Sequence, residues 1–98
     1  EAAQGLARRV LTEQPKGDDS AKLTHAFRLC LVREPKDFEI DRLASLLEDS
    51  RAWYRSRDGE AKSLAGAPLP EGVTINEAAA WTATVRVLLN LDEFLTRG

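Results

Sequence analysis

The chain has 98 residues, which is enough for one domain that buries a hydrophobic core without a disulfide or a structural metal ion. Its composition, 43% hydrophobic and 31% charged, is typical of a globular chain and excludes an intrinsically disordered one. The formal net charge of -2 comes from interspersed acidic and basic residues, which argues against nonspecific binding to nucleic acid.

Two short helices are predicted in the first third of the chain. Residues 2–13 carry apolar residues at spacings of three and four, the pattern of an amphipathic helix. Residues 14–17 interrupt this pattern with a proline and a glycine. The Asp-Asp-Ser run at residues 18–20 then supplies side-chain acceptors and negative charge suited to a helix start. We expect a second helix from about Ser20 to Val32.

The second helix combines an apolar stripe with a polar side. The stripe comprises Leu23, Ala26, Phe27, Cys30 and Leu31. We interpret Cys30 as a small core residue rather than a nucleophile, and as the single cysteine it excludes an intrachain disulfide. His25 lies on the polar side. Because zinc needs about four donors and no further ligands occur at a recognisable spacing, His25 is interpreted as a solvated surface residue.

Pro35 separates the second helix from a third. It disfavours the helical conformation at the residue before it, and Asp37 and Glu39 then place negative charge in a first helical turn. The third helix is expected to fade at residues 57–59, with a further turn or two of helix over residues 60–65. Its predicted apolar face comprises Ile40, Leu43, Leu46, Leu47, Trp53 and Tyr54.

Three arginines near the end of the third helix, Arg51, Arg55 and Arg57, flank Trp53 and Tyr54. Such a mixture of basic and aromatic residues is used by proteins that stack on nucleic-acid bases. Here acidic neighbours dilute the charge, and both aromatic residues continue the apolar face. We therefore favour core aromatic residues beside a solvated arginine face.

The last helix has the clearest predicted start. It follows a loop at residues 66–72 that contains two prolines and is bounded by glycines. Thr74 and Glu77 form a capping box, in which the Thr74 hydroxyl accepts from the Glu77 amide and the Glu77 carboxylate returns to the Thr74 amide. The predicted helix, Ile75–Thr96, has the widest apolar arc, so it should be central, with Trp81 in the core. The arc comprises Ala78, Trp81, Val85, Val87, Leu88, Leu89, Leu91, Phe94 and Leu95, and the polar stripe comprises Thr82, Arg86, Asn90, Glu93 and Arg97.

Asp92 falls within the apolar arc of this last helix. At about 100° per residue it lies among leucine and valine positions, where a carboxylate must be paired, hydrogen-bonded or protonated. It could be a general acid or base in a cleft, or a structural anchor neutralised by Arg28 or Arg33. We favour the anchor, because no second catalytic group is identifiable and the adjacent Glu93 points about 100° away.

Two segments carry a resemblance to a known family. The run from Leu23 to Pro35, LTHAFRLCLVREP, and the ending from Ala80 to Arg97, AWTATVRVLLNLDEFLTR, are similar to the C-terminal end of a large planctomycete family. Those proteins join a c-type cytochrome-like segment to two domains of unknown function, and this chain resembles the end of the second. The resemblance covers nearly the whole chain, and its most specific motifs are Arg-Glu-Pro and Asn-Leu-Asp-Glu-Phe.

The resemblance implies an extracytoplasmic, multidomain parent connected with electron transfer or the breakdown of complex polysaccharide. It supplies no catalytic residue, and the haem-binding motif of the family lies outside this segment. Lys36 stands where similar sequences often place serine or threonine, which removes a standard side-chain cap from the third helix. The two motifs also suggest that the Arg-Glu-Pro corner meets the last helix, with Arg33 or Arg28 neutralising Asp92.

Together these patterns predict a single all-α domain over residues 1–98, a compact bundle of about four main helices with the C-terminal helix central. Because the chain starts at Glu1 and lacks methionine, we expect a piece of a larger protein. Its expected role is non-catalytic: a structural or interaction domain that packs against other domains of its parent or a protein partner, leaving an exposed apolar patch. The alternative is an accessory domain that contributes to an enzyme or a haem-containing electron-transfer assembly completed by upstream domains. Neither a cofactor, a metal ion, nucleic acid nor membrane insertion is expected for this domain.

Overall fold

The computed structural model describes residues 2–14, 16–31 and 33–97, with side chains described as far as residue 90. All regular structure in this part of the chain is helical. The helices are α1 (Ala2–Glu13), α2 (Asp19–Cys30), α3 (Asp37–Tyr54), α4 (Asp58–Ala65) and α5 (Ile75–Arg97). The predicted all-α class is therefore confirmed. The short segment expected after α3 is a helix in its own right, which makes five helices in the described residues rather than about four.

The starts of α2 and α3 follow from their first residues. Asp18 precedes α2, and its carboxylate accepts a hydrogen bond from the Ala21 amide at 2.8 Å. α3 begins after Lys36, whose side chain makes no capping bond. The Glu39 carboxylate instead accepts from the Lys36 amide at 2.8 Å, and the Glu39 amide donates to the Lys36 carbonyl. A carboxylate in the first turn thus replaces the cap that a lysine side chain cannot provide.

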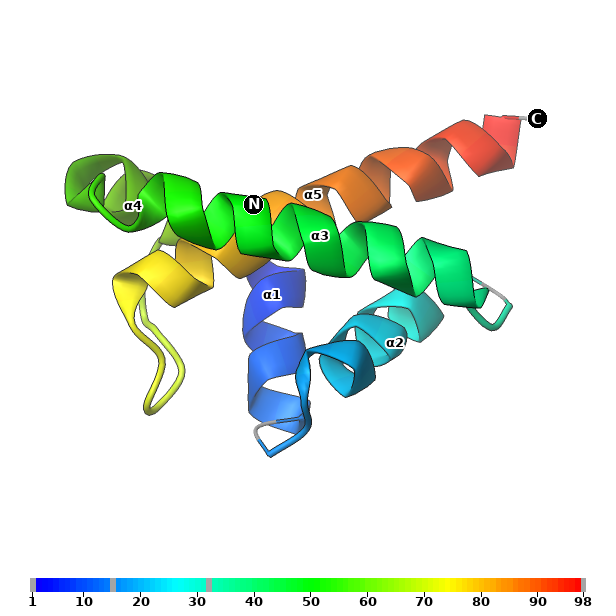
Figure 1. Cartoon of the computed structure of the whole chain (residues 1–98), viewed down its shortest axis with the longest axis horizontal. Helices are drawn as coiled ribbons and strands as arrows, with labels where there is room; N and C mark the ends of the chain where they lie inside the picture. The colour runs from blue at the N-terminus through cyan, green and yellow to red at the C-terminus, as the bar shows by residue number, and fades with distance from the viewer. Residues whose placement is uncertain (1, 15, 32, 98) are drawn as a thin grey trace.

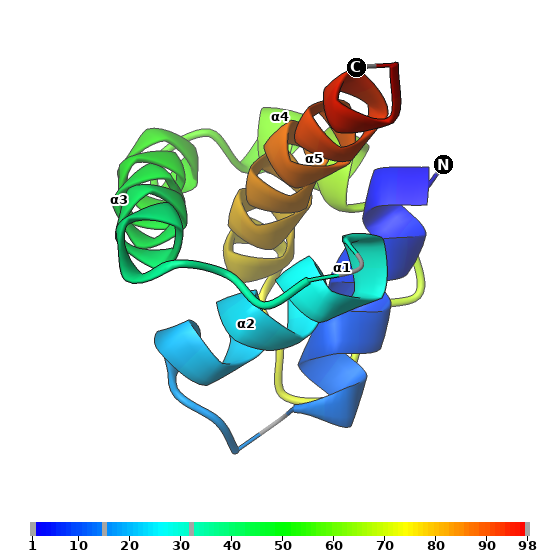
Figure 2. The same ribbon diagram turned by 90° about the vertical axis from the view of Figure 1, so that its right-hand side faces the viewer.

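α5 is the central helix, as its wide apolar arc predicts. It packs against each of the other four helices, and Figure 2 shows α1, α2, α3 and α4 grouped around it. Trp81 is fully buried, and Val85 and Leu88 lie beside it in the main core. Because all four other helices contact α5, this helix decides where the core lies.

The core has two parts that differ in the size of their side chains. The main part joins α1, α2, α3 and α5 and contains the large residues Phe27 and Trp81. A smaller part lies between α4 and α5 and consists of four buried alanines, Ala61, Ala65, Ala78 and Ala79. Small side chains on both helices let their axes approach closely, which allows a helix of only eight residues to pack firmly.

The burial of α5 differs from the predicted wheel at two positions. Thr82, predicted on the polar stripe, is buried, and so is Thr84. Each hydroxyl donates to the carbonyl four residues earlier, that of Ala78 at 2.8 Å and that of Ala80 at 2.9 Å. Val87, predicted on the apolar arc, is 45% exposed. Residues 78–82 are all buried because neighbouring helices enclose this half of α5, so its threonines satisfy their hydroxyls within the helix.

The end of α3 corrects a second prediction. Trp53, predicted on the apolar face, is 52% exposed, and the Arg57 guanidinium lies over its ring at 3.7 Å from the centroid. The Arg57 Nη1 also donates to the Trp53 carbonyl at 2.7 Å. Tyr54 is partly covered by the alanine cluster between α4 and α5. The chain turns between α3 and α4 (Figure 1), and Tyr54 packs against the alanine cluster while Trp53 beside it is left exposed.

Candidate functional site

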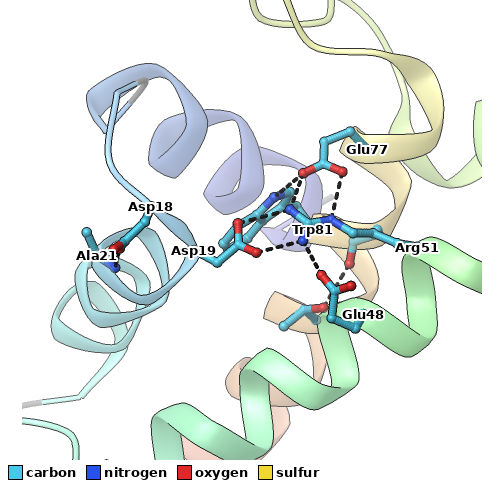
Figure 3. A network of polar contacts seen from close by, with 9 residues as sticks. Asp18, Asp19, Ala21, Glu48, Arg51, Glu77 and Trp81 are labelled. Carbon is cyan, nitrogen blue, oxygen red and sulfur yellow. Dashed lines mark hydrogen bonds and ion pairs between the residues drawn. The ribbon is translucent and has the colours of Figure 1, made fainter.

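The densest group of charged contacts in the described residues lies where α2, α3 and α5 meet. Arg51 of α3 is at its centre, and its side chain is 24% exposed (Figure 3). Asp19 and Glu77 each bind the guanidinium at two points, with distances of 2.6 and 3.0 Å for Asp19 and 2.9 and 2.5 Å for Glu77. Glu48, one turn earlier on α3, binds the same guanidinium. We call these residues, together with Trp81, the Arg51 cluster.

Trp81 lies on the side of the cluster that faces the core. Its indole Nε1 donates to Glu77 Oε2 at 3.0 Å, and the indole itself is fully buried in the main core. The Glu77 carboxylate therefore joins a surface ion pair to a core aromatic residue. Tryptophan is well suited to this position because it combines a large apolar ring with one N–H donor that needs a partner when buried.

Helix geometry explains why these charges occur where they do. Asp19 lies in the first turn of α2 and Glu77 in the first turn of α5, whereas Arg51 lies in the last turn of α3. Acidic groups are stabilised at helix N-termini and basic groups at C-termini, because unsatisfied amides and carbonyls give each helix a dipole. The end of one helix and the starts of two others thus meet with favourable charges on all three.

Hydrogen bonding stabilises the charged forms in the Arg51 cluster. The bonds from Asp19 and then from Glu77 raise the pKa of Arg51 above its ordinary value. The bond from Arg51 lowers the pKa of Asp19. Three carboxylates surround one guanidinium, which leaves a formal excess of two negative charges. Arg51 therefore offsets the mutual repulsion among the acids, with a smaller contribution at Asp19 from the charge of Lys22.

The cluster uses the whole hydrogen-bonding capacity of its arginine. A guanidinium has five N–H donors. The Nε donates to Glu77, the Nη1 donates to Asp19 and Glu48, and the Nη2 donates to Asp19 and Glu77. A depression of about 340 Å³ next to Arg51 is also lined by Arg55, Thr74, Asn76 and Glu77. An anion entering it would have to replace a carboxylate to bind Arg51.

The predicted capping residues lie at the edge of this cluster. The Thr74 hydroxyl accepts from the Glu77 amide at 3.1 Å, which confirms the first half of the capping box. The prediction for the Glu77 carboxylate needs correction, because both of its oxygens accept from Arg51. Trp81, predicted as a core residue, is confirmed as one. A well-placed arginine offers the carboxylate a stronger, charge-assisted partner than a backbone amide does.

The arginines predicted to neutralise Asp92 both bind other acids. Arg28 donates to Glu34 at 2.8 and 2.9 Å, and Arg33 binds Glu39 at two points, each at 2.8 Å. Both pairs join the Arg-Glu-Pro corner to a neighbouring helix, the first to α2 and the second to α3. The side chain of Asp92 lies outside the described residues, so its pairing stays a prediction.

His25 and Cys30 have different surroundings. His25 lies at the surface as predicted but is only partly solvated, because its side chain is 24% exposed and its Nε2 lies 2.6 Å from Glu13 Oε1. Glu13 also accepts from Arg9 at 2.9 Å, and the bonds from His25 and Arg9 lower the pKa of Glu13. This group ties α2 to the end of α1. Cys30 is half-buried and packs against the main core.

The Arg51 cluster is absent from the sequence-based prediction, which assigned Arg51 to a solvated face. The sequence contains its members only as separate signals: an acidic residue in the first turn of α2, another in the first turn of α5, and a basic residue in the last turn of α3. Residue spacing shows that Glu48 and Arg51 are neighbours on one helix. It does not show that the ends of three helices meet, because that depends on how they pack around α5.

Comparisons of the chain with protein family models, with curated proteins and with solved structures found no match. Within residues 2–14, 16–31 and 33–90, no group of three or more histidine, cysteine, aspartate or glutamate side chains is arranged to hold a metal ion. None of the helices in the described part of the chain is long and apolar enough to cross a membrane.

Proposed function

We propose that this chain is a non-catalytic structural or interaction domain of a larger, extracytoplasmic multidomain protein. The observation that carries the proposal is the saturation of Arg51, whose five donors all bind carboxylates of the same chain. A group used in this way stabilises the packing of three helices. It has no donor to offer a substrate or a developing charge, as a catalytic arginine must.

An apolar groove between α3 and α5 supports the interaction part of the proposal. It has a volume of about 500 Å³, and Phe38 on its rim is 59% exposed. The groove, which we call the α3–α5 groove, is lined by Phe27, Phe38, Glu39, Arg42, Leu43, Ser45, Leu46, Asp49 and Val87. Contiguous apolar surface with a polar rim is typical of protein contact sites. The extracytoplasmic, multidomain setting rests on the family resemblance alone.

Hydroxyl-radical footprinting tests the interaction role. The reactivity of Phe38 would be measured in the isolated chain at high dilution and in a longer natural protein that contains it. We expect a severalfold lower reactivity in the longer protein, because another domain or subunit covers the α3–α5 groove. Trp81 is the internal control, since its buried indole should react weakly in both samples. Equal reactivity of Phe38 in the two samples would contradict the proposal.

A further inference from the structure

We infer that the outer side of α3 is a self-association surface, on which a second copy of this chain packs its own α3 in the antiparallel direction. The inference rests on the proposed interaction role and names the partner. The surface consists of Phe38, Arg42, Ser45, Leu46, Asp49 and Trp53, which we call the α3 stripe. At about 100° and 1.5 Å per residue these positions share an arc of about 100° and span about 22 Å.

The α3 stripe is uncovered in the folded chain. Phe38 and Trp53, at its two ends, are 59% and 52% exposed. Arg42, Ser45 and Asp49 between them are exposed as well. Figure 2 shows α3 at the edge of the molecule, and in Figure 1 no other helix lies in front of it. Two large aromatic residues that are each more than half exposed, at either end of one helical stripe, are the feature that requires explanation, although the Arg57 guanidinium lies over the Trp53 ring.

The charges on the α3 stripe lack partners within the described part of the chain. Arg28, Arg33 and Arg51 each bind at least one carboxylate. Arg42 and Asp49 form no ion pair with any residue whose side chain is described. They cannot pair with each other, because positions seven apart lie two turns, about 10 Å, from one another along the helix. Two opposite charges on one stripe are thus available to an external partner.

The order of residues along the α3 stripe is complementary to itself when reversed. Consider two copies of α3 that pack in antiparallel directions, with the two-fold axis passing between Ser45 and Leu46 of each copy. Arg42 and Asp49 are equally distant from that centre, so Arg42 lies against Asp49 of the second copy. Phe38 and Trp53 are also equally distant from it, so the two aromatic residues meet. A two-fold axis produces each of these contacts twice.

Other partners fit the α3 stripe less well. A parallel arrangement of two copies in register would place Arg42 against Arg42 and Asp49 against Asp49, and both contacts are repulsive. A peptide of a single charge sign would be attracted by one of these residues and repelled by the other. The small Ser45 beside the centre permits the close approach of a second helix, and the α3–α5 groove, which five of the six stripe residues also line, receives apolar side chains from it.

The test uses the 98-residue chain and two charge reversals at exposed positions. Sedimentation velocity from about 1 µM to about 1 mM should show a concentration-dependent dimer of the natural sequence. Arg42→Glu alone and Asp49→Arg alone should each weaken the dimer at least about tenfold, because each reversal creates two like-charge contacts across the two-fold axis. Circular dichroism should show both variants to be as helical as the natural chain.

Mixing the two variants gives the decisive result. In an equimolar mixture the glutamate introduced by Arg42→Glu in one chain faces the arginine introduced by Asp49→Arg in the other. The unchanged Asp49 of the first chain faces the unchanged Arg42 of the second, so a heterodimer should form about as strongly as the natural dimer. The double variant Arg42→Glu/Asp49→Arg should likewise recover the homodimer. A change confined to folding would produce neither recovery.

Three results would overturn the inference. They are a natural chain that stays monomeric throughout this concentration range, a dimer that both reversals leave unchanged, and a mixture of the variants that fails to associate. If the chain is monomeric but Phe38 is protected in the longer protein, self-association fails and the proposed interaction role stands. If the chain dimerises as described but footprinting of the longer protein shows Phe38 open, coverage of the α3–α5 groove by other domains of that protein fails and self-association stands.

Discussion

Arg51 and Glu77, which are 26 residues apart in the sequence, form a two-point ion pair between the end of α3 and the start of α5. The Glu77 carboxylate also accepts from the buried indole of Trp81, one turn further along α5. This relationship fixes the central helix relative to α3 from both the surface and the core.

Replacement of Arg51 should cost considerable stability. Arg51→Met keeps most of the aliphatic stem but leaves three carboxylates close together without their cation, so we expect the free energy of unfolding to fall by about 2 to 3 kcal/mol. Urea unfolding followed by circular dichroism measures the change. Arg55→Met, at the exposed residue that directly follows α3, is the matched control, with an expected effect of less than about 0.5 kcal/mol. Equal effects of the two substitutions would show that the cluster contributes nothing beyond ordinary surface charge.

The two tryptophans should report opposite environments. In Trp53→Phe the remaining Trp81 should emit at short wavelength and resist quenching by iodide, because its ring is fully buried. In Trp81→Phe the remaining Trp53 should emit at longer wavelength and be quenched readily. We expect Trp81→Phe to lower the free energy of unfolding by about 1 to 3 kcal/mol through the lost volume and the lost bond to Glu77. Trp53→Phe should change it by less than about 0.5 kcal/mol. Similar quenching of the two variants would contradict the assigned burial.

Two glycine substitutions should have opposite signs. Gly66 ends α4 with a φ of 71°, and an added Cβ would lie 3.0 Å from the Gln4 side chain, which binds the Leu64 carbonyl. Gly66→Ala should therefore lower the free energy of unfolding by about 1 to 2 kcal/mol. Gly5 lies within α1 with open space around its Cα, so Gly5→Ala should raise it by about 0.5 to 1 kcal/mol. Thermal unfolding of both variants tests the pair, and destabilisation by Gly5→Ala would show that other atoms lie within 4 Å of the added Cβ.

Acid should weaken the start of α3. The bond from Arg33, with help from the Lys36 amide, lowers the pKa of Glu39 from 4.5 to about 2. Because the folded pKa lies below the unfolded one, the ionised carboxylate stabilises the fold fully above about pH 4.5, and this contribution is lost as the pH falls toward 2. Glu39→Gln should make the pH dependence of the free energy of unfolding shallower in this range.

The cause of the Glu39 shift can be tested separately. Arg33→Met removes the strongest of its partners, so the pKa of Glu39 should rise toward its ordinary value, as measured by NMR titration of the side-chain carboxyl. If Glu39 of the natural chain already titrates near 4.5, the ion pair with Arg33 is not maintained in solution.

Local patterns identified most of the helices and the central one among them. The acidic run before α2, the hydroxyl of Thr74 and the wide apolar arc of α5 all act within a few residues of one another. Interactions of this range depend on spacing along the chain, and spacing is what a sequence displays. The same patterns could not count α4 as a separate helix, because its stability comes from alanine packing against α5.

The exposure of single residues at helix edges was decided by packing. A helical wheel places Trp53 and Val87 on apolar faces, but both are exposed in the structure. It places Thr82 on the polar stripe, but Thr82 is buried. A wheel gives the direction of each side chain relative to its own helix, but burial depends on which neighbour occupies that direction. His25 follows the same rule, since the end of α1 brings Glu13 to it.

By itself, the sequence determined the all-helical class, the helix starts and the identity of the central helix, because these depend on hydrogen bonds and apolar periodicity within single segments. Tertiary structure decided that Asp19, Arg51 and Glu77 share one site, because their contacts join helix ends that are 26 and 32 residues apart. It also decided that the α3 stripe is left uncovered. Long-range contacts of this kind depend on the packing of all the helices at once, and no local spacing encodes them.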